Sequence, residues 1–290
     1  MNVDFIPSRL PQRSVHEALD NSISREEVYE AVRLLKNSKA SGEDGLPNEI
    51  WKIGSALSDY LVEVCNHALE GKGPKEWVDC TMTLTTTAEL PFVNRRQSLQ
   101  CGPDTEVAEL VPDVAPESQY GCQPGRSTED LIYMLRQLFE KAWEKNTTMY
   151  AILIDFHKAF DSVDRGLLWE VLSRFGVPPK CLDALRNLHT NMEGWAAYRG
   201  ELSSNFLIHT GVRQRSIGSP VLFILFLAAM MEVAFPDNSR FRSEMGVKLE
   251  VAGGDITEVR RFRRPTLNTI LDCIYADDTA LVSDNFEDII

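Results

Sequence analysis

Hydrophobic residues recur at helical spacing through much of the first part of the chain, which predicts that this part is mainly helical. Ser24 followed by Glu27 forms a capping-box pattern and marks the start of one helix. The apolar positions of that helix are Val28, Ala31, Val32 and Leu35. Further helices are expected over residues 47–51 and 59–70.

A long amphipathic helix is predicted from Glu129 to Lys145, with Ser127 and Thr128 as its cap. Its apolar side comprises Leu131, Met134, Leu135, Leu138, Phe139 and Ala142. Two more helices are expected over residues 165–175 and 179–192, the first capped by Asp161 or Ser162. The longest apolar stretch, residues 221–231, is too short to span a bilayer and predicts a buried helix.

Other segments have the pattern of strands. Residues 149–154 form a continuous apolar run without helical spacing, which predicts a strand buried on both faces. Residues 195–198 and 205–209 are predicted to form a hairpin. From residue 81 to 116 strand propensity gives way to no clear period, and little order is expected there.

Near the end of the chain two apolar runs flank the sequence Tyr275-Ala276-Asp277-Asp278. The pattern predicts a hairpin with adjacent carboxylates at its turn. Such a turn is compatible with a metal site, but aspartate is also a common turn residue that bonds its own backbone. The hairpin alone leaves both interpretations open.

A third carboxylate, Asp155, stands at the end of the strand predicted over residues 149–154. Capping of the next helix accounts for Asp161 and leaves Asp155 without a structural role. Three aspartates associated with strand ends therefore favour the metal interpretation, because carboxylates placed close together repel one another when no cation is present.

The composition limits the class of protein. The 290 residues are 43% hydrophobic and 25% charged, as expected of a soluble globular protein with a substantial core. The N-terminus lacks a signal-peptide pattern, and the six cysteines show no metal or disulfide spacing. The expected location is the nucleus or cytoplasm rather than a secreted one.

The formal net charge of -13 argues against extensive contact with nucleic acid, which requires lysine and arginine to replace phosphate counterions. Local basic tracks nevertheless occur at residues 260–264 and 36–39. Each track is either a phosphate-binding surface or an ordinary solvated one.

Five segments resemble the reverse transcriptases of non-LTR (LINE-like) retrotransposons. LIDFHKAFDSVD at residues 153–164 resembles motif A, and YADDTALV at residues 275–282 resembles motif C. Residues 39–47 resemble the KAPGPDGIP segment, residues 119–128 resemble QxGFRPGRST, and residues 211–220 resemble motif B. Because all five keep the family's order, the chain is identified as a member of this family. We expect it to be a truncated and partly degenerate member.

The resemblance implies an α+β fold with the fingers and palm of a right-hand polymerase, an antiparallel palm sheet packed on helices, and no thumb. Residues 1–130 are expected to be mainly fingers and residues 131–290 mainly palm, with residues near 166–213 returning to the fingers. The implied activity is RNA-directed DNA polymerisation. The implied partners are an RNA template, a DNA primer and deoxynucleoside triphosphates, with no membrane and no obligate protein partner.

The resemblance also assigns the site. Asp155, Asp277 and Asp278 are expected to be catalytic and to bind two Mg²⁺ ions, or Mn²⁺, with the carbonyl of Phe156 assisting. The expected nucleotide-binding residues are Phe160, Gln214 and Arg96. Phe160 is expected to lie beneath the sugar and to exclude a 2′-hydroxyl group.

Some positions depart from the family pattern. Arg215 stands where the family has glycine after the motif B glutamine, and residues 85–89 lack the expected lysine. One alternative is therefore a catalytically dead retrotransposon relic that at most binds nucleic acid. Another is a reverse transcriptase resembling a group II intron maturase.

Overall fold

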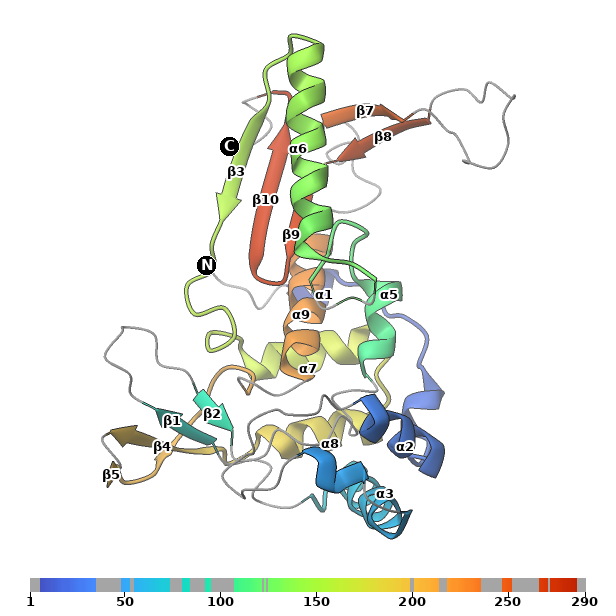
Figure 1. The fold of residues 1–290 in the computed structure, drawn as a ribbon, viewed down its shortest axis with the longest axis vertical. Coiled ribbons are helices and arrows are strands. Elements are labelled where there is room, and N and C mark those ends of the chain that lie inside the picture. The colour runs from blue at the N-terminus through green and yellow to red at the C-terminus, as the bar shows by residue number, and fades with distance from the viewer. Residues whose placement is uncertain are drawn as a thin grey trace. The chain divides into compact units, whose positions relative to one another are not determined.

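A computed structural model of the chain contains helices and mainly antiparallel sheets, which confirms the expected α+β class (Figure 1). The chain forms two compact units, residues 1–114 with 158–226 and residues 115–157 with 227–290. The structure describes residues 6–34, 48–52, 55–73, 80–83, 92–94, 107–121, 123, 125–198, 201–213, 218–235, 247–251, 266–270 and 272–285.

The first unit is mainly helical. Its longer helices are α2 (Arg25–Leu34), α3 (Ser55–Leu69), α7 (Arg165–Arg174) and α8 (Pro179–His189). Its shorter helices are α1 (Ile6–Arg9), η1 (Glu17–Asp20), η2 (Asn48–Lys52), η4 (Val107–Leu110) and α5 (Val111–Val114). The helices predicted over residues 59–70, 165–175 and 179–192 are thus confirmed.

The predicted capping box at the start of α2 is confirmed. The Glu27 amide donates to Ser24 Oγ at 3.2 Å, and the Ser24 amide donates to Glu27 Oε2 at 2.6 Å. The bond from the Ser24 amide favours the ionised carboxylate and is the main reason why the pKa of Glu27 is lowered, and the Ser24 side chain adds to the effect. Helix α2 then buries Val28 and Val32 in one cluster with α3.

The expectation of little order from residue 81 to 116 is wrong for residues 107–114. These residues form η4 and α5, and their apolar side chains Val107, Leu110, Val111 and Val114 are buried. The four positions are spaced i, i+3, i+4 and i+7, which is a helical pattern that the sequence already contained.

The first unit also has a small mixed sheet in the order β2-β1-β4-β5, with β6 paired to β4. Its strands are β1 (Cys80–Thr83), β2 (Phe92–Asn94), β4 (Glu193–Tyr198), β5 (Glu201–Leu202) and β6 (Phe206–Leu207). The antiparallel pairing of β4 with β6 confirms the predicted hairpin.

The second unit has a three-stranded antiparallel sheet in the order β3-β10-β9. Its strands are β3 (Tyr150–Ile154), β9 (Asp272–Tyr275) and β10 (Asp278–Ser283). Helix α6 (Thr128–Glu144) lies along this sheet, and a separate hairpin joins β7 (Val247–Val251) to β8 (Thr266–Ile270) (Figure 1). The core between α6 and the sheet contains Leu131, Leu138, Cys273, Ala280 and Val282.

The prediction that β3 is buried on both faces is wrong. Leu153 is 80% exposed and Ile152 is 37% exposed. Strand β3 is an edge of its sheet, and the core residues beneath α6 come from β9 and β10. The continuous apolar run correctly indicated a strand but gave no information about which of its faces another element covers.

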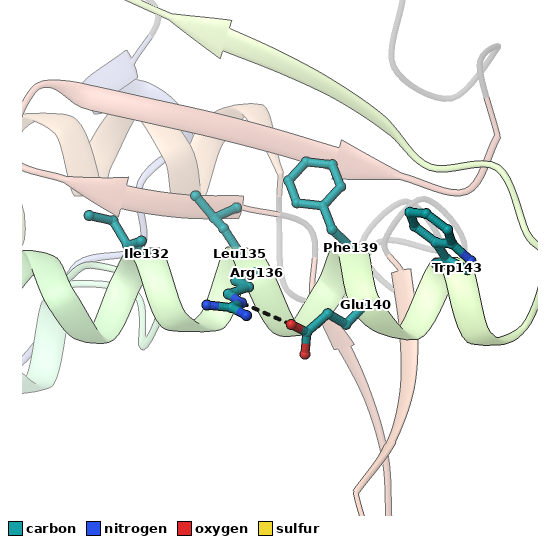
Figure 2. Close-up of a pocket in the computed structure, with 6 residues that line it drawn as sticks. All are labelled: Ile132, Leu135, Arg136, Phe139, Glu140 and Trp143. Atoms are coloured by element: carbon teal, nitrogen blue, oxygen red, sulfur yellow. Dashed lines mark hydrogen bonds and ion pairs between the residues drawn. The ribbon is translucent and has the colours of Figure 1, made fainter.

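Helix α6 begins as predicted, because Ser127 and Asp130 form a capping box. Its predicted apolar side is only partly buried. Phe139 is 54% exposed, since it follows the fully buried Leu138 and lies about 100° farther around the helix. Figure 2 shows Phe139 and Trp143 on one side of α6, in a pocket that also includes the ion pair between Arg136 and Glu140.

The residue that caps α7 differs from the prediction. The Asp164 carboxylate accepts a hydrogen bond from the Leu167 amide at 3.0 Å. Asp161 and Ser162, the predicted caps, belong instead to a preceding turn in which both amides donate to the Lys158 carbonyl at 2.9 Å. The predicted helix start at Arg165 was therefore correct, but the predicted capping residue lies two or three positions before the observed one.

Helix α9 (Gly218–Ala234) confirms the predicted buried helix, because every residue from Val221 to Ala229 is buried. Within the described parts of the chain, no helix combines the length and apolar character needed to cross a membrane. Three cysteines, Cys65, Cys181 and Cys273, are buried free thiols.

Replacing Ser24 with alanine removes the acceptor for the Glu27 amide and is expected to destabilise the protein by about 1 kcal/mol. Urea denaturation monitored by circular dichroism measures this loss. Ser173→Ala, at an exposed position inside α7, is the matched control and is expected to change stability by less than about 0.5 kcal/mol. Equal effects of the two substitutions would contradict a capping role for Ser24.

Candidate functional site

The aspartate-bearing hairpin has a two-residue turn. Asp278 of β10 pairs with Tyr275 of β9, so Ala276 and Asp277 form the turn between the strands. Ala276 has a φ of 54°, in the left-handed region that L-residues other than asparagine and aspartate rarely adopt. Two-residue hairpins need a positive φ at their first turn residue. The turn therefore places Asp277 at the tip of the hairpin and Asp278 at the start of β10.

Strand β3 brings Asp155 to the same end of the sheet. Ile154, the last residue of β3, pairs with Thr279 in the antiparallel ladder. Continuing this register by one residue sets Asp155 opposite Asp278. In the sequence, residues 158–226 of the first unit and part of the second unit separate these two aspartates, and the ladder brings their strand ends together.

The three aspartates differ in exposure. Asp155 and Asp278 are exposed, and Asp277 is half-buried. Within the described ranges, no three acidic, histidine or cysteine side chains are gathered into a metal-binding group. The ladder thus sets the aspartates on adjacent strand ends without closing them around a common point. Carboxylate oxygens, together with the Phe156 carbonyl that follows Asp155, are the donor type that magnesium prefers.

The opposite side of the hairpin is closed. Cys273 is buried, and burial raises the pKa of its thiol to about 12, with the charge of Asp272 adding to the effect. Its sulfur lies 3.9 Å from the sulfur of Met134 on α6. The neutral thiol is therefore part of the core between α6 and the sheet.

The segment before α6 pairs with β9. The Tyr120 amide donates to the Ile274 carbonyl at 2.7 Å, and the Ile274 amide donates to the Ser118 carbonyl at 2.9 Å. These bonds place residues 118–121 against the hairpin, although the sequence gave no sign of this contact. Residues 119–128 were recognised as a family segment without any indication of what they touch.

Phe160 lies in the first unit, where the turn after motif A meets the start of motif B. Its ring is half-buried, and its centroid lies 4.9 Å from that of Phe223 on α9. The Val212 amide donates to the Phe160 carbonyl at 2.9 Å, and the Gly211 amide donates to the Val163 carbonyl at 2.8 Å. The backbone that leads to Gln214 is thus bound to the turn that carries Phe160.

Arg165 holds the same backbone from the other side. Its guanidinium donates to the carbonyls of Gly211 at 2.8 Å, His189 at 2.7 Å, Ile208 at 3.0 Å and Thr210 at 3.2 Å. Sequence reasoning missed this residue, because an arginine at the start of a helix carries no signal of such distant partners. The charged guanidinium of Arg165 thus fixes the backbone of residues 208–211, at the start of the motif B segment.

Several predicted residues lie outside the described parts of the chain. These are Arg96 and Gln214, together with Arg215, the segment at residues 39–47 and the basic tracks at residues 36–39 and 260–264. The structure therefore positions the three aspartates, Phe156 and Phe160 of the predicted site.

The family is decided by comparison with known proteins. The family model "Reverse transcriptase (RNA-dependent DNA polymerase)" matches residues 104–290, which is more than half of the chain. The chain belongs to the reverse transcriptase family. The matched region includes all three aspartates and the two segments that resemble motifs A and C.

Two relatives of this reverse transcriptase domain come from mobile elements. The chain is 23% identical to the "Transposon TX1 uncharacterized 149 kDa protein" of Xenopus laevis over 94% of its own length, and 20% of that protein is covered. It is 26% identical to the "RNA-directed DNA polymerase from mobile element jockey" of Drosophila funebris over 72% of its length, and 24% of that protein is covered. The chain thus spans about a fifth to a quarter of each relative.

These matches confirm the prediction of a reverse transcriptase domain of the non-LTR, LINE-like kind. By resemblance, the chain is an RNA-directed DNA polymerase domain.

Gly211 is expected to tolerate no side chain. Its φ is +81°, and an added Cβ would lie 2.6 Å from Asp161 Cα and 2.8 Å from the Phe160 carbonyl oxygen. Gly211→Ala is therefore expected to cost about 3 kcal/mol, from left-handed strain and backbone clash together. Gly125→Ala is the control, because Gly125 has a φ of +75° with no atom near its Cβ position, so strain alone costs about 1 kcal/mol. Equal losses in urea denaturation would show that the close approach is unimportant.

Proposed function

We propose that the chain catalyses RNA-templated addition of deoxynucleotides to a primer 3′-hydroxyl group, with Asp155, Asp277 and Asp278 as its catalytic carboxylates. The observation that carries the proposal is the β3–β10 ladder, whose register leads from Ile154 opposite Thr279 to Asp155 opposite Asp278. Membership in the reverse transcriptase family supports the reaction class, and this ladder supports the choice of these aspartates.

The donor set fits magnesium. Three carboxylates and the carbonyl of Phe156 stand at one end of an antiparallel strand pair, and two of the carboxylates are exposed. Bound there, Mg²⁺ or Mn²⁺ would stabilise the charge on the attacking and leaving oxygens. Asp155, Asp277 and Asp278 would hold the cation, and Asp155 and Asp278 are exposed to water.

The nucleotide pocket is proposed to contain Phe160, Gln214 and Arg96. Phe160 would present its half-buried ring to the sugar and exclude a 2′-hydroxyl group by bulk. Its support is the contact of the ring with Phe223 and the hydrogen bond from the Val212 amide to the Phe160 carbonyl, which holds the backbone that carries the ring. Gln214 would contact the nucleotide and template, and Arg96 the triphosphate.

The partners follow from this chemistry: an RNA template, a DNA primer and deoxynucleoside triphosphates. In terms of a right-hand polymerase, we assign the part of the second unit that carries the aspartates to the palm. The first unit would contribute residues to both the fingers and the palm. The competing hypothesis is a catalytically silent domain that binds nucleic acid, and it is favoured by Arg215, which replaces a glycine of the family pattern, and by the net charge of -13.

Primer extension tests the proposed reaction. With an RNA template, a DNA primer and Mg²⁺, Asp277→Asn is expected to lower the extension rate by on the order of a thousandfold, because one negative oxygen donor is lost; this corresponds to about 4 kcal/mol. Asp284→Asn is the matched control at an exposed position just beyond β10, and it is expected to extend at the wild-type rate. Equal rates for wild type and Asp277→Asn would contradict the assignment.

Arg215→Gly tests the competing hypothesis. If the arginine obstructs the nucleotide, the glycine variant is expected to extend primers at least about tenfold faster than wild type, equivalent to about 1.4 kcal/mol. The RNA affinity of the two proteins, measured separately by fluorescence anisotropy, should be the same. RNA binding without extension by either protein would support the silent domain and refute the polymerase.

A further inference from the structure

The tip of the aspartate hairpin rests on a buried side chain from outside the sheet. Gln119 is 1% exposed. Its Oε1 accepts hydrogen bonds from the Gly121 amide at 2.7 Å and from the Ala276 amide at 3.0 Å. Ala276 is the left-handed turn residue that directly precedes Asp277. A single carboxamide oxygen therefore joins the segment before α6 to the residue that sets the position of Asp277.

The contact is close as well as hydrogen-bonded. A Cβ atom on Gly121 would lie 2.4 Å from the Ala276 nitrogen, which is a backbone atom that cannot swing away. Glycine at this position lets the two backbones approach until Gln119 reaches Ala276. The backbone of the turn at Ala276 is thus fixed against the backbone of residues 119–121.

Residues 117–121, which contact the turn, are themselves held by Arg126. Arg126 Nη1 donates to the carbonyls of Glu117 and Gln119, the latter at 3.1 Å, and its guanidinium lies 5.0 Å from the centre of the Tyr120 ring. Ser127 then caps α6. The loop is therefore bound to the hairpin on one side and to the start of α6 on the other, so Gln119 has little freedom to follow a moving turn.

We propose that Gln119 is a positioning residue for the aspartate-bearing turn: its buried carboxamide oxygen holds the Ala276 amide and thereby fixes Asp277 for metal binding. This inference rests on the proposed function. A left-handed alanine costs about 1 kcal/mol, and a bound amide offsets that cost. Gln119 touches no reacting group, so its effect passes through the backbone of the turn.

Two variants separate the acceptor from the volume of the side chain. Gln119→Met keeps a similar size but provides no strong acceptor, so the Ala276 amide loses its partner. Gln119→Glu keeps an oxygen in the same place and is expected to restore the bond. Gln137→Met is the matched control, because Gln137 lies on α6 in the same unit and its side-chain amide donates to the exposed carboxylate of Glu140.

The first measurement is hydrogen exchange of the Ala276 amide in the full chain labelled with ¹⁵N-alanine. Gln119→Met is expected to exchange at least about tenfold faster than wild type, while Gln119→Glu and Gln137→Met remain within about twofold. Gly121→Ala, which disturbs the same contact from the other partner, is expected to accelerate exchange similarly. Unchanged exchange in Gln119→Met would overturn the inference whatever the enzyme does.

The second measurement is Mn²⁺ affinity from water proton relaxation, followed by primer extension. Gln119→Met is expected to bind Mn²⁺ about tenfold more weakly and to lose kcat with little change in the KM for deoxynucleotide. A variant with fast exchange but wild-type Mn²⁺ affinity would show that the bond is merely structural and would overturn the inference. Absence of primer extension by the wild-type chain, with exchange and Mn²⁺ binding as expected for the variants, would instead refute the proposed reaction and leave the role of Gln119 in place.

Discussion

The main-chain ladder between β3 and β10 is the interaction on which the arrangement of the aspartates depends. Its register is fixed by burial, because Ala280 and Val282 of β10 must face the core beneath α6. A slip of one residue would turn both side chains to the opposite face. The same slip would carry Asp278 away from the strand end that Asp155 follows. Apolar contacts far from the tip of the hairpin therefore determine where the polar groups stand.

A second constraint acts on the turn rather than on the strands. Strand pairing fixes Asp278, but Asp277 lies on the two-residue turn, outside the ladder. Its position depends on Ala276, whose left-handed conformation is supported by Gln119. The second unit thus combines two kinds of restraint: a ladder that any apolar strand pair could form, and a specific buried contact from a distant loop.

The second unit also has exposed apolar side chains on its surface. Leu153 on β3 and Phe139 and Trp143 on α6 are largely exposed, although a sheet and a helix of this composition usually bury such side chains. Figure 2 shows Phe139 and Trp143 on α6. The pocket beside α6 is apolar except for the ion pair of Arg136 with Glu140. Its chemistry therefore differs from that of the carboxylate tip.

The sequence by itself determined the α+β class, the main helices, the aspartate hairpin and the family, because periodicity, capping residues and contiguous motifs are local properties of the chain. It placed the capping box at Ser24 and the helix cap at Ser127 correctly. Only the tertiary structure decided which faces are covered, so β3 and Phe139 were predicted to be more buried than they are. It also decided which distant groups meet, as Gln119 meets Ala276 and Arg165 meets four carbonyls. Burial and long-range hydrogen bonds depend on neighbours that the chain brings together only when it folds.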